Sequence, residues 1–295
     1  MDHLKRIQKA IDFIEIHLKD KIDTEIIAKE ACFSMWHFQH VFSSIVGDSV
    51  KAYIRKRRLT SALIELATSK RKIIDIAFDY QFESQESFSR AFKTLFDCTP
   101  GECQKKKIKS IIPHNKLEIT FEYLEHLFKG VTMQPQFVTL EEKKIIGIGT
   151  TFISILSPEK NNHIVIPKLW DKYLKRTGEI KNRKNDFSIG LCEYIADKTQ
   201  KKHPDECLYM AGVEVSDFSF VPEEMTSKII PAGRYAIFTH KGTLDKLEHT
   251  MNYIFGSWLP KSGEELRDAP DLELYDHRFK HDSENSEIDI YIPIK

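Results

Sequence analysis

Two nine-residue stretches combine hydrogen-bonding side chains with a repeated aromatic spacing. Residues 34–42 read SMWHFQHVF, residues 84–92 read SQESFSRAF, and in both a Ser is followed by Phe four and eight positions later. Phe residues at i and i+4 lie on one face of a helix. We therefore expect the side chains between them on the opposite face. Amide and guanidinium groups placed there could hydrogen-bond the base edges or the phosphates of DNA.

The residues expected to face outward form the candidate DNA-binding set. They are Met35, Trp36, His37, Gln39 and His40 in the first stretch, and Gln85, Glu86, Ser87 and Arg90 in the second. Gln39 suits a base edge, and Arg90 suits guanine or a phosphate. The competing interpretation, ordinary solvated residues of a helical bundle, is disfavoured by the repetition. His37 and His40 are three residues apart without further ligands, so we expect no metal site and no cofactor.

The elements that must position these side chains are helices throughout residues 1–107. Ser34 and Ser84 are predicted N-caps of the two helices, with Gly47 and the run Thr99-Pro100-Gly101 as their stops. A longer helical pattern runs from about Val50 to Thr68. We expect it to connect the two units as a rod of about 27 Å. Such a rod could hold two helices for successive major grooves, which lie about 34 Å apart.

The whole of each copy repeats, not only the second helix. Ile27-Ala28 aligns with Ile76-Ala77, and Phe33 aligns with Phe82, which gives two helix-turn-helix units. Together with RKRRLTSA at 55–62 and IIDIAFDYQFESQESFSRAFKTLFDCTP at 73–100, this tandem resembles the AraC/XylS family of bacterial transcription regulators over about residues 5–105. The resemblance implies an all-α DNA-binding domain, here 1–107. It also implies DNA contacts at a subset of the candidate positions: Trp36, Gln39, His40, Gln85, Glu86, Ser87 and Arg90.

Two positions depart from the family pattern. The family usually has Gly in the helix-turn-helix connections, where this chain has Cys32 and Gln81. Each must then adopt the turn backbone, at a cost in stability if that backbone is left-handed.

From Val131 onward the pattern changes to alternating strands. Six segments read as strands, namely 137–152, 187–196, 207–215, 227–240, 271–279 and 286–294, and two read as helices, 165–176 and 244–260. Their order predicts an α+β domain of duplicated strand-helix-strand-strand units, with an antiparallel sheet and helices on one face. Residues 108–130 are interpreted as a linker whose later part could be a short helix.

The second half carries acids among aromatic residues instead of a catalytic motif. It has no P-loop, no GxSxG, no HExxH and no Cys with a convincing His partner, so we expect no enzyme and no catalytic residues. Glu273 and Tyr275 lie two apart and so share one face of a predicted strand. A carboxylate inside an aromatic cleft is costly unless a cation matches it, and aromatic faces attract cations. We therefore expect a site for lipophilic organic cations.

The order IPAGRYAIFTHKG, IFGSWLP, LELY and IPIK resembles the GyrI-like effector-binding domain, over about residues 131–295. The resemblance implies binding of amphipathic small molecules, with Glu273 as the acid. The candidate ligand-binding residues are Trp170, Tyr194, Tyr209, Tyr235, Trp258, Glu273 and Tyr275. Together the two resemblances indicate a transcription regulator of the Rob type, expected to be an activator. Alternatives for this domain are a small-molecule hydrolase, in which a Glu with a Tyr acts as base, and a protein-interaction module.

Length, charge and cysteine content agree with this assignment. The chain has 295 residues, enough for two domains, and residues 1–107 carry a net charge of +4 against −4 for the rest. Five cysteines without a CxxC pair indicate thiols of a cytoplasmic protein, not disulfides or a zinc site. No apolar segment is long enough for a membrane span. The expected partners are double-stranded DNA, a small-molecule effector and, as a further candidate, RNA polymerase.

Overall fold

A computed structural model describes residues 3–106, 114–120, 123, 133–154, 157, 159–195, 199, 201–203 and 205–295. The chain divides into two compact units, Met1–Leu127 and Phe128–Lys295. Most of the predicted linker 108–130, including its possible helix, lies outside the described residues. The linker boundaries therefore stay a prediction.

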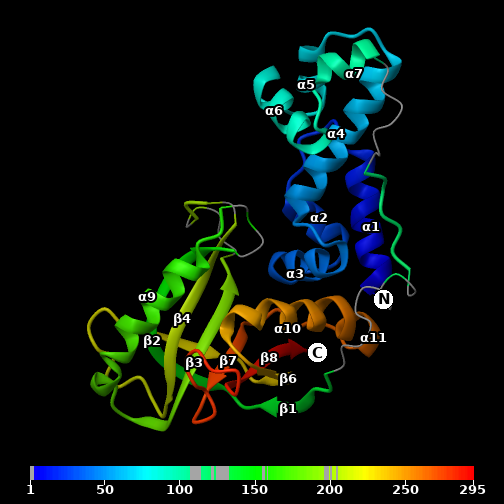
Figure 1. The fold of residues 1–295 in the computed structure, drawn as a ribbon. Helices are drawn as coiled ribbons and strands as arrows, with labels where there is room; N and C mark the ends of the chain where they lie inside the picture. Colours follow the sequence, from blue (N-terminus) through cyan, green and yellow to red (C-terminus); the bar gives the residue numbers. More distant parts are fainter. Residues whose placement is uncertain are drawn as a thin grey trace. The chain divides into compact units, whose positions relative to one another are not determined.

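The first unit is built from seven helices in its described part (Figure 1). They are α1 (His3–Ile16), α2 (Thr24–Glu30), α3 (Met35–Val46), α4 (Val50–Thr68), α5 (Ile73–Asp79), α6 (Gln85–Phe96) and α7 (Pro100–Lys106). The pairs α2–α3 and α5–α6 are the two predicted helix-turn-helix units, and α4 is the predicted rod between them. The short helix α7 was not expected from the sequence, which predicted only a stop at Thr99-Pro100-Gly101.

The predicted caps close the two repeated helices. The Ser34 hydroxyl accepts a hydrogen bond from the His37 backbone N–H, and the left-handed Gly47 ends α3. Ser84 and Ser87 form a reciprocal capping box at the start of α6. These local bonds satisfy backbone donors that would otherwise be orphaned at each helix start.

The repeated phenylalanines form equivalent pairs in the two units. Phe38 and Phe42 pack with ring centroids 5.5 Å apart, and Phe88 and Phe92 do the same at 5.5 Å. All four side chains are fully buried. The repeat in the sequence is therefore a repeat of core packing, as predicted.

Three of the four basic side chains at 55–58, those of Lys56, Arg57 and Arg58, bond to groups of the helical unit itself. The Arg57 guanidinium donates two hydrogen bonds of 2.7 Å to the Glu15 carboxylate, which joins α4 to α1. Arg58 donates to the backbone oxygen of Leu18 at 2.8 Å, and Lys56 pairs with Asp48. These bonds hold the rod in place and leave the cations less available for phosphates.

The two connections that lack the family's glycine adopt the left-handed backbone. Cys32 has φ +56° and Gln81 has φ +61°. Gln81 gains a compensating contact, because its side-chain amide donates to the Lys19 backbone oxygen at 2.7 Å. Cys32 is exposed, and its thiol makes no such bond within the described part of the chain.

Replacing Cys32 by Gly is expected to stabilise the helical unit by about 1 kcal/mol, because a non-Gly residue at positive φ carries strain of about that size. The matched change Gln81→Gly should gain less, since it also removes the bond to Lys19. Urea denaturation followed by helical circular dichroism measures both. Equal gains, or a loss for Cys32→Gly, would contradict the strain argument.

Residues 114–120 run along the helical unit without forming a helix or strand. The Ile119 N–H donates to the Gln8 side chain at 2.9 Å, and Lys116 pairs with Asp12 at 2.6 Å, both on α1. The His114 carbonyl accepts from Arg57 of α4. Residues 114–120 are therefore held against α1 and α4 by these bonds.

The second unit contains one eight-stranded antiparallel sheet. Its strands are β1 (Gln136–Leu140), β2 (Lys143–Ile153), β3 (Arg183–Tyr194), β4 (Glu206–Val215), β5 (Thr226–Ile230), β6 (Gly233–Lys241), β7 (Asp271–Tyr275) and β8 (Glu287–Ile294). Helix α9 (Asn162–Leu174) and the short η1 (Thr177–Glu179) follow β2. The second predicted helix consists of η3 (Leu244–Lys246), α10 (Leu247–Tyr253), the π-helical turn η4 (Ile254–Trp258) and α11 (Leu259–Ser262). The α+β class and the antiparallel sheet with helices are as predicted.

The sheet must curl, because its topology joins opposite ends. The strand order is β1-β6-β8-β7-β3-β4-β2-β5, so β5 is one edge and β6 lies next to the other. Only Pro231 and Ala232 separate the end of β5 from the start of β6. Two residues cannot span a flat eight-stranded sheet, whose strands lie about 4.8 Å apart. The two ends therefore approach each other.

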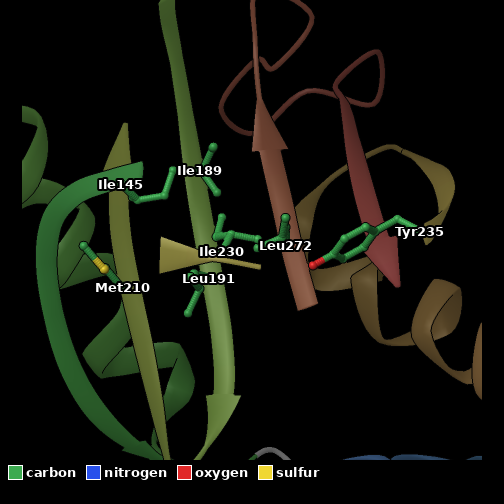
Figure 2. Packing of buried hydrophobic residues seen from close by; sticks show 7 residues of the cluster. All are labelled: Ile145, Ile189, Leu191, Met210, Ile230, Tyr235 and Leu272. Atoms are coloured by element: carbon green, nitrogen blue, oxygen red, sulfur yellow. The ribbon is translucent and has the colours of Figure 1, made fainter. Parts of the chain in front are cut away.

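The curl encloses an apolar core between strands that are distant in the sheet order. Figure 2 shows this cluster, with Ile230 of β5 and Tyr235 of β6 near Leu191 of β3 and Leu272 of β7. Its members are Ile145, Ile189, Leu191, Met210, Ile230, Tyr235 and Leu272. Helix α9 packs against β2 and β4. Among the described residues, no helix is long and apolar enough to cross a membrane.

Candidate functional site

Helix α6 presents the second group of candidate DNA-binding residues at the surface. Gln85, Glu86 and Arg90 are exposed. Within the described part of the chain, the Arg90 guanidinium makes no hydrogen bond or ion pair, so its donors are available. Ser87 differs, because its hydroxyl donates to the Ser84 carbonyl at 2.9 Å and accepts from the Ser84 N–H. The main role of Ser87 is therefore to cap the start of α6.

Helix α3 carries the first group of candidate DNA-binding residues: Met35, Trp36, His37, Gln39 and His40. The helix MWHFQHVFSSIV contains no Asp, Glu, Lys or Arg, and Trp36 and His40 pack with ring centroids 4.3 Å apart. Whether these residues contact DNA stays a prediction.

A carboxylate surrounded by aromatic side chains lies in the second unit. Both Tyr209 of β4 and Tyr275 of β7 donate a hydroxyl to Oε2 of Glu273, at 2.6 and 2.9 Å. The Trp170 indole on α9 donates in turn to the Tyr209 hydroxyl at 3.2 Å. Four of the seven predicted ligand-binding residues therefore form one hydrogen-bonded cluster, called here the acid–aromatic cluster: Trp170, Tyr209, Glu273 and Tyr275.

Strand register explains how these side chains meet. Gly190 of β3 lies directly opposite Glu273 of β7 and Ala211 of β4. Tyr209 is two residues from Ala211 and thus points to the same face as Glu273. It reaches across β3 because Gly190 leaves the space open. A Cβ at Gly190 would lie 2.2 Å from the Tyr209 hydroxyl and 2.8 Å from Glu273 Oε2.

The acid–aromatic cluster has an unmatched negative charge when Glu273 is ionised. Within the described residues, no Lys, Arg or His forms an ion pair with Glu273, and its Oε1 accepts no hydrogen bond. Burial raises the pKa of Glu273, while hydrogen bonds from Tyr209 and Tyr275 oppose that rise. Burial and the neighbouring carboxylate also raise the pKa of both tyrosines well above the ordinary value. The tyrosines are therefore neutral donors, and the carboxylate keeps one free acceptor.

Aromatic rings extend the cluster on both sides. Trp170 and Tyr275 have ring centroids 4.7 Å apart, and Tyr275 meets Phe279 edge-on at 4.9 Å. Phe152 of β2 lies edge-on to Tyr209 at 6.3 Å. Ring faces beside a carboxylate form an environment that favours organic cations.

Two family matches decide the class of the protein. Residues 133–295 match the family described as GyrI-like small molecule binding domain, and residues 27–106 match a helix-turn-helix domain of the AraC type. The chain belongs to the AraC/XylS regulators of the Rob type. It is thus a DNA-binding transcription regulator with a GyrI-like domain for small molecules.

Relatives support this assignment along nearly the full length. The transcriptional regulator Rob of Salmonella typhimurium is 27% identical over 93% of this chain and 91% of its own. The right origin-binding protein of Escherichia coli is 26% identical over the same shares. The regulatory protein SoxS of E. coli is 39% identical over 35% of this chain and 95% of its own. The first two relatives therefore match across both units.

The other three predicted ligand-binding residues lie outside the acid–aromatic cluster. Tyr235 is fully buried in the core of the GyrI-like domain, with Arg267 5.1 Å from its ring centroid. Trp258 packs against Phe238 at 4.8 Å. The Tyr194 ring has the Lys201 ammonium 3.3 Å from its centroid, so one ring face already holds a cation. Aromatic type alone did not distinguish core residues from site residues.

Sequence reasoning missed three contributors to the cluster: Phe152, Gly190 and Phe279. Gly190 provides the space for Tyr209 and Glu273 to meet, and an isolated Gly inside a strand pattern was the available signal, because it often marks a close approach. Phe279 lies beyond the end of β7 at Tyr275, although a strand was predicted over 271–279, and the alternation of that predicted strand puts Phe279 on the face of Glu273 and Tyr275.

Proposed function

We propose that the chain activates transcription in response to a small amphipathic organic cation, which binds at the acid–aromatic cluster. The observation that carries the proposal is the Glu273 carboxylate, which has two tyrosine donors on one oxygen and no basic partner among the described residues. A bound cation would supply the missing charge, and the rings of Trp170 and Tyr275 would contact its apolar part.

Binding is better supported than hydrolysis at this cluster. A general base must take a proton from water or substrate, and hydrogen bonds from Tyr209 and Tyr275 weaken Glu273 as a base because they stabilise its ionised form, although Oε1 keeps a free acceptor. The raised pKa of each tyrosine keeps it protonated at neutral pH, which makes a tyrosinate nucleophile unfavourable. We therefore propose a binding domain without turnover, tested by the absence of product when candidate cations are incubated with the protein.

We propose further that α3 and α6 enter successive major grooves. The support is the repeat of capped helices at the two ends of α4, which is 19 residues long. A helix of that length spans about 28 Å. Because the two helix-turn-helix units differ in sequence, the bound chain has a direction on DNA, and its sites should be asymmetric. A directional complex presents one side to RNA polymerase, which is why we favour activation.

Arg90→Ala is expected to weaken binding to a selected DNA site by about 1–3 kcal/mol, or roughly 5- to 150-fold, because an exposed guanidinium suits guanine. Fluorescence anisotropy with the selected duplex measures this change. Arg90→Lys separates base from phosphate contact, since Lys keeps the charge but not the two-donor geometry. Lys241→Ala, at an exposed lysine of the second unit, is the control. Unchanged affinity for Arg90→Ala would remove Arg90 from the interface.

A further inference from the structure

A pair of cysteine thiols lies at the junction between α6 and α7. Cys98 follows the C-cap residue Asp97 of α6, and Cys103 lies in the first turns of α7. Both are free thiols, yet their sulfurs are 2.6 Å apart. A disulfide bond is about 2.05 Å long. Closing the bond therefore needs only a small displacement of the sulfurs, and no rearrangement of the two helices.

The two thiols differ in how far an oxidant can reach them, which sets the order in which they react. Cys98 is half-buried, so a small oxidant can reach it, whereas Cys103 is 1% exposed. Burial, together with the neighbouring Cys98, raises the pKa of Cys103 to about 12. Cys103 therefore keeps its proton and can donate it toward Cys98. This arrangement makes Cys98 the thiol that reacts first and Cys103 the buried thiol that resolves the product.

We propose that Cys98 and Cys103 form a reversible intramolecular disulfide when the protein meets a hydroperoxide. In the first step the Cys98 thiolate attacks the peroxide, the O–O bond breaks, and Cys98 becomes a sulfenic acid while the leaving alkoxide or hydroxide takes a proton. In the second step the Cys103 sulfur displaces hydroxide from Cys98 and loses its proton, which gives the disulfide and water. Two electrons pass from the thiols to the peroxide, and a dithiol reductant reverses the change.

The bond would fix the C-terminal end of the second helix-turn-helix unit. Helix α7 is already anchored, because the Gln104 side chain donates to the Arg71 carbonyl at 2.8 Å. The Glu102 carboxylate also accepts from the Thr99 N–H and hydroxyl, both at 2.8 Å. The disulfide would add a covalent link between this anchored turn and α6, the helix that carries Arg90.

The remaining cysteines serve as internal comparisons. Cys32 is exposed and stands in a different connection, and Cys192 and Cys207 lie on neighbouring strands in the second unit. Among the described residues, Cys98 and Cys103 are the thiols whose sulfurs are in contact. Oxidation by a hydroperoxide should therefore yield one defined disulfide, not a mixture.

The test uses the full chain, reduced, freed of reductant and treated with one equivalent of hydrogen peroxide. Trypsin cleavage after Lys93 and Lys105 releases both cysteines in one peptide, TLFDCTPGECQK. After alkylation of free thiols, the expected product is that peptide without label and lighter by two hydrogen atoms. Dithiothreitol before alkylation should restore two labels. Cys192 and Cys207 should stay fully labelled.

Two variants keep the test decisive. Cys103→Ser should stop the reaction at a Cys98 sulfenic acid, which dimedone captures, and Cys98→Ser should leave Cys103 reduced. A peptide that keeps both labels while Cys32 is oxidised would overturn the proposal. A disulfide that joins Cys98 to Cys32 would also overturn it. A third contrary result is that Cys98 is oxidised at the same rate in Cys103→Ser and in the unaltered chain, while the unaltered chain yields no unlabelled peptide.

Discussion

Glu273→Gln is expected to lower the affinity of the protein for benzyltrimethylammonium by about 2–5 kcal/mol, or roughly 30- to 4,000-fold. The substitution keeps the size of the side chain and leaves Tyr209 and Tyr275 an oxygen to donate to. It removes the charge that we propose the cation meets. Isothermal titration calorimetry with the full chain measures the change directly.

Two controls separate charge from shape in this experiment. Neopentylbenzene, the neutral carbon isostere of the cation, should bind the unaltered chain and Glu273→Gln equally, because it meets only the aromatic rings. Glu193→Gln should leave cation affinity within about twofold, since Glu193 is already paired with Lys228. Equal cation affinity in the unaltered chain and in Glu273→Gln would refute the assignment of this site.

The affinity of this site for the cation should depend on pH, and the direction of that dependence can be predicted. Burial raises the pKa of Glu273, and the cation binds the ionised carboxylate. Affinity should therefore be constant above that raised pKa and fall as pH drops through it, with proton release on binding in that range. In Glu273→Gln the affinity should not vary with pH over this interval.

Phe88→Ala is expected to destabilise the helical unit by about 3–5 kcal/mol, because deleting a large buried ring leaves a cavity. The Phe88 side chain is fully buried and packs beside Phe92. Since small domains are stable by only about 5–15 kcal/mol, much of the stability would be lost. The measurement is urea denaturation of the full chain followed by circular dichroism at a helical wavelength.

Phe78→Ala provides the matched control on the neighbouring helix α5. The Phe78 ring is 52% exposed. Its removal should therefore change the free energy of unfolding by no more than about 0.5 kcal/mol. The contrast between Phe88 and Phe78 tests whether the repeated Phe spacing defines the core. Similar losses for the two variants would show that it does not.

Local signals in the sequence predicted the helical unit well because they are physically local. Ser34, Ser84 and Gly47 cap helices through bonds to residues three or four positions away, and the Phe pairs repeat at helical spacing. The helix α7 escaped prediction because Pro100 was interpreted as a stop, whereas Pro also suits the first helical position. The left-handed backbone at Cys32 and Gln81 followed from the position of glycine in the family.

Non-local features were harder to predict. That Glu273 and Tyr275 share a strand face follows from a spacing of two, but the contact with Tyr209 depends on the pairing of β7, β3 and β4. The sequence of one strand does not show which other strands pair with it in a sheet of this order. For the same reason the sequence did not show that Tyr235, on a strand of similar pattern, lies in the core.

The most direct test of DNA reading by two helices is selection of genomic fragments by the purified full chain, followed by hydroxyl-radical footprinting of the recovered site. We predict one asymmetric site with two protected segments, about one helical turn apart, each centred on a major groove. Binding should weaken with salt for every sequence, and single base changes in either segment should each cost about 1–3 kcal/mol. Protection of a single groove would show that one of the two helices α3 and α6 acts without the other, and would contradict the tandem account.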